Sequence, residues 1–145
     1  FRDTIAVVAE NGKWGVINRN GKVVMPLEDD QLAYTHLPTV LRVRKGKSWG
    51  LRRLNAKHYL VYPQFDTLRD YSENFAAAHK AYVGWGFVNR RGLLICPMRF
   101  EAVEHFKGGM AAVQLDDQWG FIDTMGRWVI LPQYESVSAA YVRQD

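Results

Sequence analysis

The chain has 145 residues, 48% of them hydrophobic and 23% charged, with a formal net charge of +4. This balance is typical of a folded domain and argues against intrinsic disorder, and no apolar run reaches the roughly 18 residues that a membrane-spanning helix needs. The single cysteine, Cys96, excludes an intramolecular disulfide, and a chain of this length can bury a core without a metal or a disulfide.

The dipeptide Trp-Gly recurs along the chain and sets a repeat period. It stands at Trp14-Gly15, Trp49-Gly50, Trp85-Gly86 and Trp119-Gly120, with spacings of 35, 36 and 34 residues. A constant period in this range is typical of repeat architectures. The sequence therefore predicts a single domain over residues 1–145 with four copies, approximately 4–39, 40–74, 75–109 and 110–145, called copies 1 to 4 below.

Copy 1 shows the order of elements that the other copies repeat. An apolar run at 5–8 precedes Trp14, and a polar stretch from Asn18 to Gly21 separates the Trp-Gly run from a third run at 23–25. Asn or Asp followed three residues later by Gly is typical of a tight turn, because the side chain caps its start and glycine accepts a positive φ at its end. Pro26 then ends the run. Each copy is therefore predicted to be a three-stranded β-meander.

The connections at 31–39 and 68–74 lack a strict alternation of polar and apolar residues. They contain Pro38, Ser72 and Asn74, which favour turns. We therefore expect surface loops between the copies.

Copy 2 departs most from the common order. Ala56 stands where the other copies have the turn glycine, so we expect Asn55 to take the left-handed conformation. Alternation places Leu41 and Val43 inward, and Arg42 and Arg44 outward on one exposed face. Residues 41–58 carry a charge of +7 and leave the rest of the chain at −3; the basic residues are Arg42, Arg44, Lys45, Lys47, Arg52, Arg53 and Lys57.

Copies 3 and 4 follow the common order most closely. Asn89 with Gly92 and Asp123 with Gly126 repeat the turn signal. In copy 4, alternation predicts a half-buried strand with Ala111, Val113 and Leu115 inward and Ala112, Gln114 and Asp116 outward. The last stretch, 135–145, reads as the start of a further copy, in which Val137, Ala139, Ala140 and Val142 could pair or cap.

Residues 119–134 have the order Trp-Gly-Phe-Ile-Asp-x-x-Gly-x-x-Val-Ile-Leu-Pro-x-Tyr, which resembles the bacterial WG repeat, also called the KWG repeat. Lys13 keeps the lysine before the tryptophan, and the resemblance is weakest in copy 2. We predict an all-β fold of four tandem units stacked as a curved β-solenoid or wrapped sheet, with a closed propeller-like or barrel form as the alternative. The resemblance further implies a bacterial surface, secreted or envelope-associated protein without shared catalytic residues.

The repeated tryptophans Trp14, Trp49, Trp85 and Trp119 are predicted to be packing elements that join neighbouring copies, supported by the turn glycines Gly21, Gly92 and Gly126. A row of aromatic faces that stacks on sugar rings or bases is the alternative. Trp128 has no tryptophan counterpart in the other copies. It is therefore a better ligand candidate than the four repeated residues.

Three partner classes are consistent with these features. The leading hypothesis is a non-catalytic protein-binding module, as an inhibitor-like partner or as part of a larger protein, and the start at Phe1 without Met favours a processed product or a fragment. The second is a carbohydrate or peptidoglycan bound at Trp128, Tyr59 or Tyr82. The third is an anionic polymer bound through Arg42, Arg44, Arg52 and Arg53, although such charges also protect a strand from edge pairing.

Catalysis is the minority hypothesis, because no catalytic or phosphate-binding motif is present. The histidines, His36, His58, His79 and His105, form no close pair of the kind that binds zinc. Cys96 aligns with Met25 and Ile130, which predicts an apolar role. Acid pairs occur at Asp29-Asp30, Asp116-Asp117 and Glu101 with Glu104, without a basic partner that the sequence reveals. We therefore predict no enzyme, no cofactor and no metal.

Overall fold

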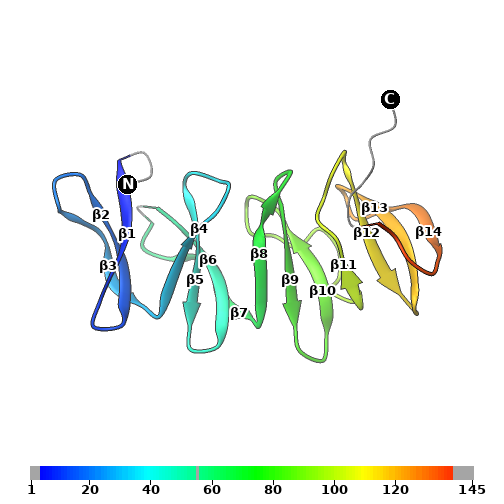
Figure 1. The fold of residues 1–145 in the computed structure, drawn as a ribbon, viewed down its shortest axis with the longest axis horizontal. Helices are drawn as coiled ribbons and strands as arrows, with labels where there is room; N and C mark the ends of the chain where they lie inside the picture. The colour runs from blue at the N-terminus through cyan, green and yellow to red at the C-terminus, as the bar shows by residue number, and fades with distance from the viewer. Residues whose placement is uncertain (1–3, 55, 139–145) are drawn as a thin grey trace. The chain divides into compact units, whose positions relative to one another are not determined.

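The computed structural model describes residues 4–54 and 56–138, and the regular structure in these residues consists of β-strands (Figure 1). None of them forms a helix that could cross a membrane. The expected left-handed conformation of Asn55 and the expected pairing of Ala139, Ala140 and Val142 lie outside the described residues.

The strands form four antiparallel sheets, each built around one Trp-Gly pair. The first contains β1 (Ile5–Glu10), β2 (Lys13–Asn18) and β3 (Val23–Asp29); the second β4 (Gln31–Tyr34), β5 (Val40–Lys45), β6 (Ser48–Arg53) and β7 (Tyr59–Phe65); the third β8 (Thr67–Ser72), β9 (Phe75–Lys80) and β10 (Gly84–Val88); the fourth β11 (Ala102–Val103), β12 (Met110–Leu115), β13 (Gln118–Asp123) and β14 (Trp128–Tyr134). The all-β repeat prediction is confirmed. Each sheet is open, so the described residues close no barrel.

The glycine turns form as predicted in copies 1, 3 and 4. Asn18 Oδ1 accepts hydrogen bonds from the backbone N–H groups two and four residues later, at 2.9 and 3.0 Å, and Asn89 and Asp123 do the same. The turn glycines have φ values of 80°, 79° and 77°, the left-handed region that glycine adopts without a steric penalty. These turns fix the hairpin between the second and third runs of a copy.

The glycine of each Trp-Gly pair has a different role, which is to let the third strand approach closely. A Cβ atom added to Gly15 would lie 2.5 Å from the carbonyl oxygen of Met25, and one added to Gly120 would lie 2.5 Å from that of Ile130. The ladder shifts register at this point in copies 1, 2 and 4. Any side chain here would therefore collide with backbone that cannot move aside.

The third strand expected in copy 3 does not form. Instead of a strand, this segment makes only isolated bridges, from Val88 to Leu94 and from Trp85 to Phe100. Where other copies place strand backbone against the Trp-Gly glycine, copy 3 places the Met98 side chain, 2.7 Å from the added Cβ of Gly86. The prediction of three strands was therefore wrong for copy 3.

The prediction of loops at 31–39 and 68–74 was also wrong for the first part of each connection. β4 pairs with β5, which places Leu32 opposite Val43, and β8 lies beside β9. Leu32, Leu68 and Tyr71 are buried. Pro38 and Asn74 fall after these strands, whereas Ser72 is the last residue of β8. Each strand pairs with the first strand of the following copy, so alternation within the segment was a weak signal.

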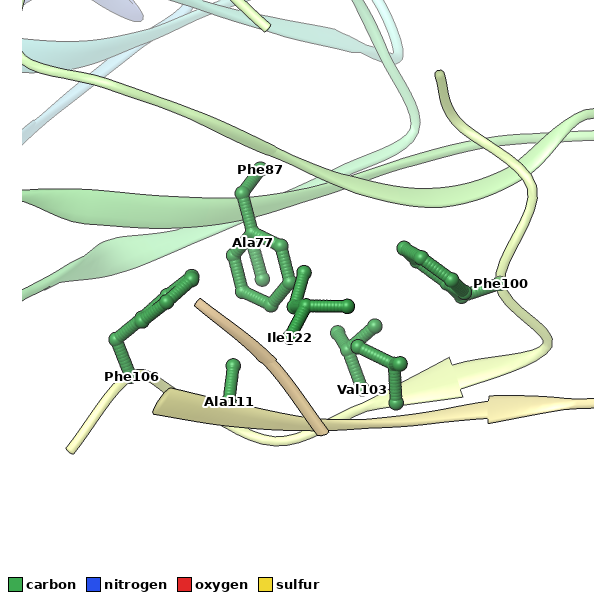
Figure 2. Packing of buried hydrophobic residues seen from close by; sticks show 8 residues of the cluster. Ala77, Phe87, Phe100, Val103, Phe106, Ala111 and Ile122 are labelled. Carbon is green, nitrogen blue, oxygen red and sulfur yellow. The ribbon is translucent and has the colours of Figure 1, made fainter. Parts of the chain in front are cut away.

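The chain divides into two compact units, Phe1–Leu68 and Arg69–Asp145. The core of the first unit contains Val16, Met25, Leu32, Leu41 and Val43. The core of the second contains Ala77, Phe87, Phe100, Val103, Phe106, Ala111, Val113 and Ile122 (Figure 2). Each core draws residues from two consecutive copies, so neighbouring copies share a core within a unit.

In copy 2, strand alternation was correct for the inward residues, while Arg42 and Arg44, predicted to be exposed, are half-buried; in copy 4 it was incorrect. Leu41 and Val43 are buried, as predicted. Ala112, predicted to face solvent, is buried as completely as Ala111 and Val113. β12 is a central strand, and a central strand covered on both faces loses the alternation of a half-buried one.

Candidate functional site

Arg52, one of the predicted binding residues, is buried in an ion pair. Its side chain donates to Asp29 Oδ2 at 2.8 Å and to Glu28 Oε1 at 3.2 Å, and its guanidinium lies 4.8 Å from the Tyr59 ring centroid. Burial raises the pKa of Asp29, against the opposing effect of Arg52. Burial of Arg52 disfavours its charged form, but Asp29 and Glu28 outweigh this and raise its pKa. Arg52 therefore stabilises the contact between copies 1 and 2.

The other predicted arginines are mostly engaged within the chain. Arg42 donates to the carbonyl oxygen of Leu68 at 3.1 Å and lies 5.9 Å from the Trp49 ring centroid. Arg44 donates to the carbonyl oxygen of Gly46 at 2.6 Å. Both are half-buried, whereas Arg53 is exposed. The basic stretch of copy 2 therefore presents less positive charge than its sequence indicates.

The predicted aromatic ligand candidates lie in separate surroundings. Tyr59 is half-buried beside Arg52 and contacts Tyr62 edge to face, while Tyr82 is fully exposed in a turn with φ 65°. Trp128 is half-buried and packs edge to face on Phe100, at a centroid distance of 6.0 Å. These contacts make Trp128 part of the border of the second core.

The four repeated tryptophans are half-buried. Trp14 and Trp85 pack against the cores of their units, and the Arg69 guanidinium lies 4.2 Å from the Trp85 ring centroid. These contacts agree with a packing role for the two residues. The predicted alternative, in which the four rings stack on a ligand, requires an open row of aromatic faces. Half-buried tryptophans do not provide such a row.

Groups with catalytic potential are occupied by structural contacts. Asp29 pairs with Arg52, and Asp30 accepts from Lys13 Nζ at 2.7 Å. A depression of about 370 Å³ beside β3 is lined by Arg52 and Glu28, which bind each other. Cys96 packs against the second core, and burial raises the pKa of its thiol. The described residues contain no cluster of three His, Cys, Asp or Glu side chains that could bind a metal.

Sequence reasoning missed a group of exposed apolar side chains that, among the described residues, lies on and beside β14. Val129 is 50% exposed, Leu131 63% and Tyr134 48%, and Met125 in the preceding turn is 67% exposed. β14 pairs only with β13 and forms an edge of its sheet within the described residues. We call Val129, Leu131, Tyr134 and the free edge of β14 the β14 face.

A comparison of repeat positions shows why Tyr134 is exposed. Tyr134 and Ile130 stand 15 and 11 residues after the tryptophan of copy 4, as Asp29 and Met25 do in copy 1. Asp29 and Met25 are 0% and 2% exposed, because copy 2 covers them. Tyr134 is 48% exposed and Ile130 is half-buried. Aligning the copies position by position was the sequence signal that could have identified Tyr134.

The sheets and the exposed edge define a repeat protein whose architecture is suited to interaction. The WG containing repeat family matches residues 14–28, 85–119 and 119–141, and the chain is a WG-repeat protein. The matched ranges omit copy 2 around its Trp-Gly pair, which agrees with its departures from the common order. The family is a non-enzymatic repeat type, and its fold is consistent with a β-solenoid.

The crystal structure of a eukaryotic initiation factor is similar to this chain, with a TM-score of 0.55 and 10% sequence identity. The similarity covers 83% of this chain and 37% of the initiation-factor chain, so the present chain spans just over a third of that protein. At this identity the likeness concerns the fold alone. No curated protein matches the sequence.

Proposed function

We propose that the chain is a non-catalytic protein-binding module and that the β14 face is its binding surface. The observation that carries this proposal is the exposure of Val129, Leu131 and Tyr134 on one edge strand. Soluble proteins seldom leave neighbouring large apolar side chains in water unless another molecule covers them. A protein partner is the ligand class that can cover apolar side chains and a free strand edge together.

The unpaired edge of β14 adds specificity to this apolar surface. A strand edge offers backbone donors and acceptors to an incoming strand, while alternate side chains provide contacts. Glycan or anionic-polymer binding has less support, because Trp128 and Tyr59 have separate neighbours and Arg42, Arg44 and Arg52 are engaged within the chain.

Site-specific photo-crosslinking tests this proposal. A benzophenone amino acid is introduced at Leu131, and irradiation is performed in extracts of the cells that make the protein. We expect discrete adducts that a protease degrades and that the substitution Val129→Lys weakens, because the lysine places a charge on the apolar face.

A matched control places the same probe at Leu93, which is exposed to a similar extent, 54% against 63%, but lies outside β14. Equal labelling from the two positions would contradict a binding role for the β14 face. Adducts that resist protease and contain glycan would redirect the proposal to a carbohydrate partner.

A further inference from the structure

We propose that the β14 face binds copy 1 of a second molecule of this chain. This inference rests on the proposed function, because it names the protein that covers the face. The interfaces between copies 1 and 2 and between copies 3 and 4 provide the template for this intermolecular contact. The two sides of one repeat interface are complementary by construction, and within the described residues copy 4 leaves one side uncovered and copy 1 leaves the other.

Within each unit, the end of one copy receives the first hairpin of the next. In the first unit, Met25 of copy 1 shares a core with Leu41 and Val43 of copy 2. In the second unit, Phe100 of copy 3 shares a core with Ile122 of copy 4 (Figure 2). Tyr134 of the β14 face and the neighbouring Ile130 occupy the receiving positions of copy 4, and within the described residues no hairpin covers them.

Copy 1 carries the complementary surface, and it is also incompletely covered. Ala6 and Val8 stand eight and six residues before the tryptophan, as Ala111 and Val113 do in copy 4. Ala111 and Val113 are 0% exposed, whereas Ala6 and Val8 are half-buried. β1 is an edge strand in the described part of the chain, whereas β5 and β12 have β4 and β11 beside them.

The residues after β14 stand at the sequence positions of β4 and β11, the strands that pair with the first strand of the following copy. In copy 4, Val103 of β11 lies opposite Val113 of β12, and copy 2 repeats this arrangement with a leucine–valine pair. The equivalent positions at the two ends of the chain are Val137 and Val8. A second molecule docked in the same register would therefore place Val137 against Val8.

A second feature of the template is a carboxylate that accepts a backbone N–H from the first hairpin of the following copy, called the clip below. Glu101, 16 residues after its tryptophan, accepts the Asp117 backbone N–H at 2.9 Å, and the equivalent acid of copy 1 accepts that of Gly46 at 2.7 Å. Glu135 occupies this position in copy 4, is exposed, and has no hydrogen-bond partner among the described residues. Gly12, at the hairpin position of Asp117, has a similar φ of 76° against 62°, so its N–H can serve Glu135 in a docked pair.

Docking has one identifiable cost. The Val7 backbone N–H already donates to Tyr34 Oη at 3.1 Å, and a strand added beside β1 replaces this bond. We therefore expect an association that depends on concentration. The interface is heterologous, because the β14 face of one molecule binds copy 1 of the other. A variant that disrupts copy 1 and a variant that disrupts the β14 face can therefore still form one interface with each other.

Thiol crosslinking between single-cysteine variants tests the register. Ala102 lies opposite Gln114 in copy 4, and the equivalent exposed positions are Ser136 and Ala9. Ala9→Cys and Ser136→Cys are prepared separately in a Cys96→Ala background, mixed, and treated with a short bismaleimide. We expect the mixed product to exceed a Leu93→Cys and Ser136→Cys control about tenfold or more, because docking raises the local thiol concentration. Equal yields from the two mixtures would overturn the proposal.

Sedimentation of the 145-residue chain provides the second measurement. We expect its mean mass to rise across about 1 µM to 1 mM, a range that covers weak to moderate protein association. Glu135→Lys, at an exposed position with no hydrogen-bond partner in the described part of the chain, should raise the dissociation constant about tenfold, since it replaces the clip with a repelling charge. Circular dichroism confirms that each variant is folded.

These measurements separate the two proposals. A chain that stays monomeric at the highest concentration overturns self-association, while protein adducts at Leu131 from the photo-crosslinking experiment would still support protein binding by the β14 face. The absence of selective adducts at Leu131, together with a monomeric chain, overturns both. A Leu131 adduct that contains a second molecule of this chain supports both protein binding and self-association.

Discussion

At the scale of single residues, substitution of the Trp-Gly glycines measures how closely the third strand packs against them. Gly120→Ala would place a methyl group against the Ile130 carbonyl, and we expect a loss of about 1–3 kcal/mol or more in the free energy of unfolding. Gly86→Ala is the matched control, because its nearest neighbour is the flexible Met98 side chain. Urea denaturation measures both variants. A Gly86 variant as unstable as the Gly120 variant would contradict the account.

The Arg52–Asp29 pair shows how a charge can replace an apolar contact between copies. Phe100 and Ile122 hold the equivalent positions between copies 3 and 4 and belong to one core. We expect Arg52→Ile alone to cost about 3 kcal/mol or more, since it leaves Asp29 buried without its main partner. The double variant Asp29→Phe and Arg52→Ile should unfold within about 1 kcal/mol of the parent chain.

The pH dependence of the single variant provides a further check. A carboxyl group whose pKa is higher in the folded than in the unfolded state stabilises the fold below its unfolded pKa and loses that contribution as pH rises through its folded pKa. Burial raises the pKa of Asp29, and removal of Arg52 removes the opposing effect. The destabilisation by Arg52→Ile should therefore grow from acidic to neutral pH. A cost that is constant with pH, or a double variant as unstable as the single one, would contradict this interpretation.

At the scale of elements, the three glycine turns differ in one ionisable group. Hydrogen bonds from the Arg127 and Met125 backbone N–H groups lower the pKa of Asp123, whereas copies 1 and 3 have asparagine there. A carboxyl with a lowered pKa contributes stability above its unfolded pKa, about 3.9, and loses it as pH falls through the folded value. We expect Asp123→Asn to keep the turn and to reduce the loss of stability in acid.

The reciprocal substitution is the control for that prediction. Asn89→Asp should introduce the same acid sensitivity into copy 3, because Asn89 Oδ1 accepts two equivalent backbone hydrogen bonds. Urea midpoints measured from about pH 2 to pH 7 compare the variants across the carboxyl titration range. Parallel pH curves for the parent and both variants would show that the turn carboxyl does not contribute.

The elements that sequence reasoning located were those with a local signal. Asn18 with Gly21, and the same pair in copies 3 and 4, specify a turn within four residues, and the structure confirms it. β4 and β8 were missed because their own residues lack a strict alternation of polar and apolar side chains, and each pairs with the first strand of the following copy rather than with a strand of its own copy. Arg52 and Asp29 were unreadable as a pair because 23 residues separate them, so their contact depends on how the copies pack.

The candidate site was missed for a different reason. Tyr134 looks like an ordinary strand residue, and only a comparison with the buried Asp29 of copy 1 shows that it lacks a neighbour within the described residues. Val129 and Leu131 carry no such signal, because Pro26, the copy 1 counterpart of Leu131, is itself exposed. Trp128 drew attention as an unmatched aromatic residue, yet its contact with Phe100 makes it partly structural. Repeat proteins therefore require comparison of equivalent positions before an unusual residue is assigned to a ligand.

At the scale of the whole molecule, the division of the cores predicts two separable folding units. All buried residues of the first core precede Leu68, and those of the second follow it. A cut between Asp66 and Thr67 keeps β8 whole beside β9, at the cost of the Arg42 bond to Leu68. We expect residues 67–145 to fold alone and residues 1–66 to be folded but less stable, because a chain near 60 residues buries a smaller share of its surface, about 60%.

Far-UV circular dichroism and the dispersion of amide proton resonances measure the folding of each fragment. The control cut between Gly50 and Leu51 divides β6, which lies between β5 and β7, and should leave the first fragment unfolded. If stability came instead from cooperation along all four copies, as nearest-neighbour coupling through a continuous repeat array would require, residues 67–145 would be unfolded by both measures. Folding of 67–145 with its urea midpoint close to a transition of the full chain would establish the pair of copies, rather than the single repeat, as the stable unit.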